Sequence, residues 1–337
     1  MFGFELNNYD RKVYNEELAE FLPKNIVDSH THVYTLDCNK ETRSDYWPNR
    51  VAQDNSIEDI MQTYKDLFPL NKVIPVIFGM PDAYLDKTNK YCGEKAKEYG
   101  LPALYVTDYS MTEDFIEEEV LKGGFQGLKP YFCNCKPGVN GNDADIYDYL
   151  PEHHLRVADK YGWKVVLHIS KPDRLKNESN IRTLMEIEQK YPNVKLIVAH
   201  IGRAYAPEDL GNAFDTLRHS KNMMFDFCAN TLSLATQKCI EAVGTKRVMF
   251  GTDLPIAKMR MRRIVENGNY INVVPRGLYG DLSNAAHMLE TDDKDLTNFT
   301  YEIIRGFKKT AEDLTLSKKD VEDIMCNNAA NLYGIKF

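Results

Sequence analysis

Short runs of apolar, β-branched residues recur along this chain, and each is followed by a polar, amphipathic stretch long enough to form a helix. This alternation is typical of parallel βα units, in which a helix covers each strand. The runs that predict strands lie at residues 26–30, 72–78, 102–106, 125–129, 164–168, 195–200, 223–227 and 247–251. The stretches that predict helices between them lie at 56–67, 82–99, 111–122, 150–161, 180–191, 206–219 and 231–243. The pattern therefore predicts an α/β fold with eight parallel strands.

Eight such repeats between about residues 26 and 253 match the roughly 250-residue span of a closed (β/α)₈ TIM barrel. The alternative is an open, doubly wound sheet, which normally carries a glycine-rich phosphate turn after its first strand. Here that position holds His30-Thr31-His32-Val33, which favours the barrel. We expect one domain over residues 1–337: a barrel at about 26–253, an insertion at 254–295 and C-terminal helices at 296–337. The two terminal helices, 296–312 and 317–332, are expected to pack on the outside of the barrel.

Charge and segment composition limit the classes of partner. Acidic residues outnumber basic ones by 50 to 42, and no dense basic run occurs, which disfavours nucleic-acid binding. The N-terminus lacks the pattern of a secretory signal, and no stretch of about 18 apolar residues predicts a membrane span. Seven scattered cysteines without a signal indicate reduced thiols. We therefore expect a cytoplasmic protein that acts on a small molecule, and the sequence leaves a homo-oligomer open.

Polar side chains with chemical function follow the predicted strands. In barrels of this type the active site lies at the carboxyl ends of the strands. Strand one ends in His30 and His32, strand four in Lys129, strand five in His168, strand six in His200, and strand eight continues into Asp253. The other four histidines, His153, His154, His219 and His287, lie on predicted helices or in the insertion and are expected at the surface.

His30 and His32 are two residues apart, and alternate side chains of a strand share a face. Both imidazoles could therefore point to the barrel axis and bind one ion. Imidazole and carboxylate ligands suit zinc, although manganese, iron and nickel stay open on ligand type alone. Such a cluster at one barrel mouth would be costly to desolvate without an ion or ligand to pair it. A metal site is therefore predicted.

Several short motifs in order along the chain are similar to those of a known family. They are His30-Thr31-His32 after Val27-Asp28, Gly127-Leu128-Lys129, His168, Ala199-His200-Ile201-Gly202, Phe250-Gly251-Thr252-Asp253-Leu254-Pro255 and the ending Asn328-Ala329-Ala330-Asn331-Leu332-Tyr333-Gly334. Together they resemble the amidohydrolase superfamily over nearly the whole chain. The Gly-Thr-Asp-x-Pro turn is most similar to the amidohydrolase-related (amidohydrolase 2) branch, which includes aminocarboxymuconate-semialdehyde-decarboxylase-like enzymes.

The resemblance implies a role for each of these residues. His30, His32, His168 and Asp253 would hold one divalent ion, with Zn²⁺ as the expected metal. His200 would orient water or substrate, or act as an acid/base catalyst, and Asp253 would shuttle a proton to the leaving group. In two-metal relatives a lysine at the position of Lys129 is carboxylated and bridges both ions. If Lys129 stays an ammonium, it would instead bind an anionic substrate, and we favour one ion.

Residues for substrate binding are less clearly marked. Arg203, just after the strand-six motif, is the main candidate because a guanidinium matches the geometry of a carboxylate. Lys129 and Tyr131 are the other two. Further candidates for the barrel mouth are Tyr34, Tyr46, Trp47 and Arg50, and the arginines Arg260, Arg262 and Arg263 in the insertion are expected to be surface residues.

The sequence thus predicts a metal-dependent hydrolase in which activated water attacks a C–N or C–O bond of a small, carboxylate-bearing substrate. One alternative is a metal-dependent, non-oxidative decarboxylase, a carbon–carbon lyase that would use the same site. The other is a non-catalytic barrel that serves as a binding protein. This last alternative predicts that a ligand position is lost, whereas all four are present.

Overall fold

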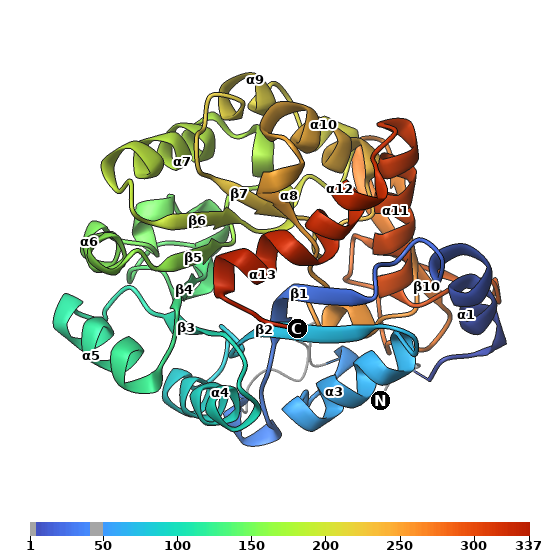
Figure 1. The fold of residues 1–337 in the computed structure, drawn as a ribbon, viewed down its shortest axis with the longest axis horizontal. Helices are drawn as coiled ribbons and strands as arrows, with labels where there is room; N and C mark the ends of the chain where they lie inside the picture. Colours follow the sequence, from blue (N-terminus) through green and yellow to red (C-terminus); the bar gives the residue numbers. More distant parts are fainter. Residues whose placement is uncertain (1–4, 41–49) are drawn as a thin grey trace.

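The computed structural model describes residues 5–40 and 50–337. Its main sheet has eight parallel strands in sequential order: β1 (Asn25–His32), β2 (Lys72–Phe78), β3 (Ala103–Thr107), β4 (Gly127–Pro130), β5 (Lys164–Leu167), β6 (Lys195–Val198), β7 (Met224–Asp226) and β8 (Val248–Met249). Helices surround the strands (Figure 1). The chain continuing from β8 completes the ring, because Ser29 N–H donates to the carbonyl of Phe250 and Asp253 N–H donates to that of His30. The predicted (β/α)₈ barrel is confirmed.

The covering helices are α3 (Ile57–Leu67), α4 (Leu85–Tyr99), α5 (Glu113–Gly123), α6 (Glu152–Tyr161), α7 (Glu178–Lys190), α8 (His200–Arg203), α9 (Ala213–Leu217) and α10 (Ser233–Val243), and α1 (Asn8–Val13) precedes the barrel. Most agree with the sequence pattern. The stretch 206–219 is an exception, since only a short 3₁₀ turn, Pro207–Asp209, and α9 form there. Gly211 separates them with φ +46°, a left-handed conformation that interrupts a helix.

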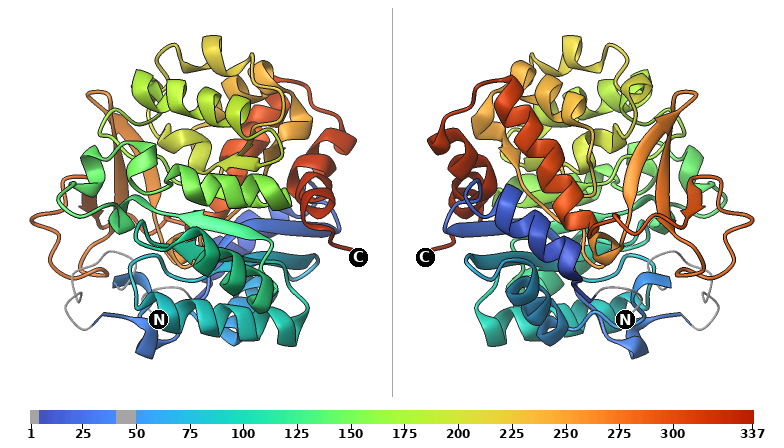
Figure 2. Two further views of the ribbon diagram at one scale, coloured as in Figure 1. Left: turned by 90° about the vertical axis from the view of Figure 1, so that its left-hand side faces the viewer. Right: turned by 90° about the vertical axis from the view of Figure 1, so that its right-hand side faces the viewer.

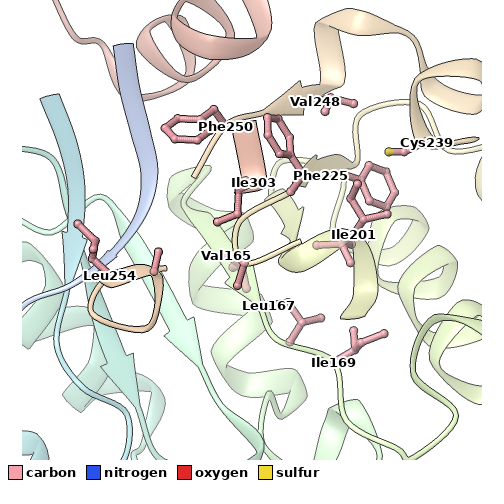
Figure 3. Close-up of a cluster of buried hydrophobic side chains, with 14 of the residues drawn as sticks. Val165, Leu167, Ile169, Ile201, Phe225, Cys239, Val248, Phe250, Leu254 and Ile303 are labelled. Carbon is pink, nitrogen blue, oxygen red and sulfur yellow. The ribbon is translucent and has the colours of Figure 1, made fainter. Parts of the chain in front are cut away.

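Apolar side chains on the two faces of the strands belong to two cores, as strand alternation requires. Between strands and helices lie residues such as Val165, Leu167, Phe225 and Val248 (Figure 3). Inside the ring lie Val27, Val76, Leu104, Val106, Val166, Ile197 and Met249. The apolar interior therefore fills the barrel below its carboxyl-end mouth.

A bulge in β1 decides which of its side chains enter the barrel. Val27 pairs with Ile74 and belongs to the inner core, and strict alternation from there would direct Thr31 inward. The register to β2 instead shifts between Asp28 and Thr31, so that His32 pairs with Phe78. One extra residue reverses the alternation. As a result His30 and His32 face the interior, where both rings contact the ring of Phe78.

The insertion after β8 forms a second sheet that the sequence pattern did not predict. It consists of β9 (Arg262–Glu266), β10 (Asn269–Pro275) and β11 (Met288–Thr291), in the order β11-β10-β9. Asn267 and Gly268 connect β9 to β10 with φ values of 49° and 75°. This two-residue Asn-Gly connection is a strong hairpin signal.

The C-terminal helices occupy two different places. Helix α11 (Phe299–Asp313) packs against α10 on the outside of the barrel, as expected. The expectation is wrong for the last segment, in which α12 (Lys318–Glu322), a π-helical turn (Asp323–Asn327) and α13 (Asn328–Tyr333) run on from one another. Its residues Cys326, Ala329, Ala330 and Tyr333 join the inner core. They cover the amino end of the barrel, opposite the insertion strands (Figure 2).

Among the described residues, no helix combines the length and the apolar character needed to span a membrane.

Candidate metal centre

Two histidines and one aspartate converge at the barrel mouth. His30 and His32 come from the end of β1, and Asp253 lies three residues after Phe250 in the segment that pairs with β1. Asp253 Oδ1 is 3.5 Å from His30 Nε2 and 3.4 Å from His32 Nε2. The donor atoms of all three lie within 4.8 Å of one another. The structure thus brings three of the four candidate ligands together.

All four histidines of the mouth are held in the same way through Nδ1. His30 Nδ1 lies 3.0 Å from Asp226 Oδ2, and His32 Nδ1 lies 3.0 Å from the carbonyl oxygen of Gly79. His168 Nδ1 lies 3.2 Å from the carbonyl oxygen of Ile169, and His200 Nδ1 lies 3.0 Å from that of Cys228. A carboxylate or carbonyl oxygen only accepts a hydrogen bond, so each neutral ring carries its proton on Nδ1. Each Nε2 then presents a lone pair, which is the arrangement that orients metal-binding histidines.

His168 and His200 line the same mouth but lie slightly apart from the cluster of three. The ring centroid of His200 is 5.0 Å from that of His30 and 4.9 Å from that of His168. His168 belongs to neither of the tight groups of donor atoms that the described residues form, which are His30–His32–Asp253 and His30–His200–Cys228. Its side chain lies on the β5 side of the mouth, against Tyr131 and Phe132.

Burial favours the neutral form of His30, His168 and His200. Desolvation, with a further contribution from the charge of Lys129, lowers the pKa of His30 to about 3. Burial likewise lowers the pKa values of His168 and His200. Burial alone would raise the pKa of Asp253, but the contact with His32 and the nearby His200 and His30 lower it, so the carboxylate is ionised. Neutral imidazole and ionised carboxylate are the protonation states that bind metals.

Lys129 is fully buried at the end of β4, with its Nζ 3.4 Å from His30 Nε2. The ammonium lies 5.0 Å from the ring centroid of Phe78 and 5.5 Å from that of Tyr131. Burial lowers its pKa. The amine therefore stands at the centre itself, beside the nitrogen that a metal ion would use.

Asp226 and Cys228 are two residues of the centre that the sequence reading missed. Asp226 is fully buried at the end of β7; its Oδ2 accepts from His30, and its Oδ1 accepts from His200 N–H and from the thiol of Cys228. Burial alone would raise the pKa of Asp226, but His30 lowers it strongly. The available signal was a lone carboxylate between Phe225 and Phe227 in an otherwise apolar run.

Left-handed backbone conformations gather at the same mouth. His200, Ile201, Arg203 and Asp253 have φ values of 59°, 48°, 62° and 69°. This region is unfavourable for residues other than glycine, and above all for a β-branched one such as Ile201. Strain of this kind persists where the surroundings hold it, and it is common at functional sites.

Two of the three predicted substrate-binding residues, Tyr131 and Arg203, lie on the His168 side. The ring of Tyr131 is 4.5 Å from that of His168, and the Arg203 guanidinium is 5.8 Å from the ring of Phe132. Of the loop candidates, Tyr34 is fully buried and donates to the carbonyl of Ala52, whereas Arg50 donates to carbonyls of the insertion. Tyr46 and Trp47 lie outside the described residues.

The expectation of surface exposure is wrong for His154, Arg260 and Arg263. His154 is fully buried under α6, where its Nε2 contacts the carbonyl of Met111, because the inner face of a covering helix points to the barrel. Arg260 is buried in an ion pair with Asp10. Arg263 points into a ring of aromatic side chains near the mouth, and of the three arginines only Arg262 is exposed.

The donor set fits a divalent metal ion. Two imidazole nitrogens and one carboxylate oxygen converge, and the Nδ1 atom of each imidazole is engaged in a hydrogen bond. Zinc and other first-row divalent ions take these ligand types.

Several solved structures share the fold at low sequence identity. A probable 2-pyrone-4,6-dicarboxylic acid hydrolase from Acinetobacter baumannii, solved with citric acid bound, is 16% identical with a TM-score of 0.59 and covers 92% of this chain and 99% of its own. The 4-oxalomesaconate hydratase of Rhodopseudomonas palustris is 13% identical with a TM-score of 0.56, covering 92% and 96%. The 2,6-dihydroxybenzoate decarboxylase from Rhizobium is 14% identical with a TM-score of 0.55, covering 93% and 99%.

No curated protein matches the chain. The model of one family, described as amidohydrolase, matches residues 27–335, which include every residue of the centre described above. The resemblance seen in the sequence motifs is therefore confirmed, and the chain belongs to the amidohydrolase family.

Proposed function

We propose that this protein is a metal-dependent hydrolase that cleaves a C–N or C–O bond of a small, carboxylate-bearing substrate. The observation that carries the proposal is the convergence of His30 Nε2, His32 Nε2 and Asp253 Oδ1, with both Nδ1 atoms already engaged. We assign His30, His32, His168 and Asp253 as the ligands of one divalent ion, with zinc as the expected metal. When bound, such an ion supplies Lewis acidity and makes water nucleophilic at neutral pH.

Asp253 and His200 are the proposed catalytic residues. The lowered pKa of Asp253 keeps its carboxylate ionised, so it can accept a proton at neutral pH and pass it to the leaving group. His200 is neutral, and its Nδ1 is occupied by the carbonyl of Cys228. Its Nε2 is therefore the atom that orients water or substrate, or accepts a proton.

Arg203, Lys129 and Tyr131 are the proposed substrate-binding residues. Arg203 makes only long contacts, of 3.5 Å each, to the carbonyls of Ile169 and Lys171, and among the described residues it has no carboxylate partner. Its guanidinium is thus available for an acid group of the substrate. The Lys129 ammonium and the Tyr131 ring would contribute charge and a flat surface beside it.

The state of Lys129 decides between one and two ions. A neutral lysine amine can be carboxylated and bridge two ions, and the burial of Lys129 lowers its pKa. We favour one ion, with Lys129 as an unmodified amine beside His30 Nε2. Metal analysis of the purified protein separates the alternatives: one ion per chain supports the assignment, and two ions per chain contradict it.

A decarboxylase is the second candidate, favoured by the 2,6-dihydroxybenzoate decarboxylases among the solved neighbours. Both reactions would use the same centre and an acidic substrate. Product analysis separates them, because a decarboxylase releases carbon dioxide and incorporates no solvent oxygen, whereas a hydrolase incorporates oxygen from water.

The test of the centre is metal content measured on the reconstituted, desalted protein. We expect near-stoichiometric divalent metal in the parent chain and its loss in the His30→Ala/His32→Ala double variant. His219→Ala is the matched control, since that side chain is exposed and remote from the mouth. Metal content that is the same in the parent and the double variant would refute the assignment. The absence of bound metal from all three proteins would also refute it.

A further inference from the structure

A cavity of about 540 Å³ opens beside Asp253 and is walled by the insertion. Its apolar lining comes from Ile256, Met259 and Phe299. The second sheet contributes Arg263 and Tyr270 to the lining, and Tyr205 also lines the cavity. Its volume is typical of pockets that bind small molecules. One end of the cavity is therefore the proposed proton acceptor, and the other is the β9–β10 hairpin.

The register of that hairpin selects which side chains face the cavity. Arg263 on β9 pairs directly with Asn272 on β10, and both line the cavity together with Tyr270, two residues before Asn272. Arg262 directly precedes Arg263 on β9, so strand alternation directs its side chain to the opposite face. There it is exposed and pairs with Asp293. The Asn267-Gly268 turn sets this register, because the length and type of a two-residue turn fix which residues of the two strands pair.

Arg263 differs from its neighbours because it has no anionic partner in the described part of the chain. Arg260 pairs with Asp10, and Arg174, which stacks on the same ring of Tyr270, pairs with Asp209. The Arg263 guanidinium donates through Nε to Asn272 Oδ1 and through Nη1 to the carbonyl of Ala229. Within residues 5–40 and 50–337, no carboxylate lies within 4.0 Å of it, and its Nη2 has no hydrogen-bond partner.

The surroundings of Arg263 make an unpaired charge costly. Its guanidinium carbon lies 4.7 Å from the ring centroid of Tyr205, 4.9 Å from that of Tyr270 and 5.0 Å from that of Phe299. Cation–π contacts offset part of the desolvation cost, and the Nη2 donors depend on whatever fills the cavity. An anion in the cavity would accept from them and pair the charge.

We propose that Arg263 binds a carboxylate group of the substrate, and that the substrate is an acid whose apolar body lies in the cavity between Arg263 and Asp253. This inference rests on the proposed function, since it takes the metal centre as the reacting end. It extends that function by assigning carboxylate recognition to a residue of the insertion, on the Asp253 side of the mouth, whereas Arg203 lies on the His168 side. The hairpin then determines which acids enter.

The experiment is a calorimetric titration of the metal-reconstituted protein with small acids. The probes are benzoate, phenylacetate and hexanoate, each paired with its neutral amide. We expect the parent chain to bind at least one acid more tightly than its amide, and Arg263→Gln to weaken that acid about 10- to 100-fold, the effect of losing a charge-assisted hydrogen bond. Arg262→Gln is the matched control on the exposed face and should bind as the parent does. Equal affinity of Arg263→Gln and the parent, or an absence of binding by every acid, would overturn the proposal.

Two further measurements, metal content and the chemical accessibility of Arg263, distinguish a failure of this proposal from a failure of the metal centre. Arg263→Gln should retain the metal content of the parent, because Arg263 is not a proposed ligand; a failure of the centre itself appears instead in the His30→Ala/His32→Ala variant. If Arg263→Gln does not fold, the parent chain carries the test alone. There, the bound acid should protect Arg263 from an arginine-selective dicarbonyl reagent, located by mass spectrometry, and its amide should not. Equal modification of Arg263 with and without the acid contradicts the proposal.

Discussion

The orientation of His30 depends on a residue far away in the sequence. Its Nδ1 is 3.0 Å from Asp226 Oδ2, and the second oxygen of the same carboxylate accepts from the backbone of His200 and the thiol of Cys228. Asp226 thus accepts hydrogen bonds from two of the mouth histidines, from the ring of His30 and from the backbone of His200. A partner of this kind fixes the tautomer of a ligand and increases its basicity.

We therefore expect Asp226→Asn to lower metal affinity about 10- to 100-fold, the usual effect of losing a hydrogen-bond partner behind a ligand. Competition with a chromogenic chelator measures the affinity. Asp215→Asn, at an exposed position on α9, is the control. An unchanged affinity in Asp226→Asn would show that Asp226 does not position His30.

Asp253 is proposed both as a ligand and as the proton acceptor. Asp253→Asn keeps the volume and one oxygen donor but removes the basic site, so the variant should fold and lose at least about 100-fold in turnover, the scale of general acid–base catalysis. Turnover of an active substrate and the thermal unfolding temperature are the two measurements. Full activity in the variant would exclude the role in proton transfer.

At the scale of elements, the last helix closes the amino end of the barrel. Tyr333 of α13 is 4% exposed and packs into the inner core, yet its buried hydroxyl has no hydrogen-bond partner among the residues that the structure describes. The stabilisation it provides must therefore come from the ring. The hydroxyl contributes nothing and carries a desolvation cost.

Tyr333→Ala should lower the free energy of unfolding by about 3–5 kcal/mol, the cost of removing a large buried ring. Tyr333→Phe removes only the unsatisfied hydroxyl and should be neutral or slightly stabilising. Chemical denaturation of the two variants measures both effects. A loss in Tyr333→Phe comparable to that in Tyr333→Ala would show that the hydroxyl, and not the ring, holds the helix.

At the scale of the whole molecule, one ion pair joins three distant parts of the chain. Arg260 of the insertion donates to both oxygens of Asp10 on α1, and Thr297 and Asn298, which precede α11, donate to the same carboxylate. Burial alone would raise the pKa of Asp10, but the hydrogen bonds from Arg260 and Thr297 lower it. The buried pair therefore ties the N-terminal helix to the insertion and to α11.

Asp10→Asn should destabilise the protein at pH 7 by about 3 kcal/mol, because it leaves the Arg260 charge buried without its partner. The folded pKa of Asp10 is below its unfolded value of about 4, so its stabilisation is complete above pH 4 and is lost as the pH falls through the folded pKa. The difference between parent and variant should accordingly narrow below pH 4. Urea unfolding at pH 7 and pH 3 measures it, and a constant difference would contradict the assignment.

Local patterns were enough to predict the barrel and the residues at its strand ends. Strand β2 was predicted at its observed bounds, since apolar alternation, helix caps and stop signals depend only on nearby residues. The motif at residues 30–32 and the turn at 251–255 were also visible locally. The chain order of the strands then placed their carboxyl ends at one mouth, because every strand of a (β/α)₈ barrel runs in the same direction.

Contacts between distant residues decided the rest. The bulge in β1 turns His30 and His32 inward through its pairing with β2, the partners of Asp226 come from other strands, and only register against Asn272 separates Arg263 from Arg262. In the sequence the last helix has only an ordinary amphipathic pattern. The structure shows that its apolar face packs on the amino end of the barrel. By itself the sequence determined the local conformations and the donor types. Tertiary structure decided which donors share a cavity, because pairing register, bulges and buried hydrogen bonds join residues that no local pattern connects.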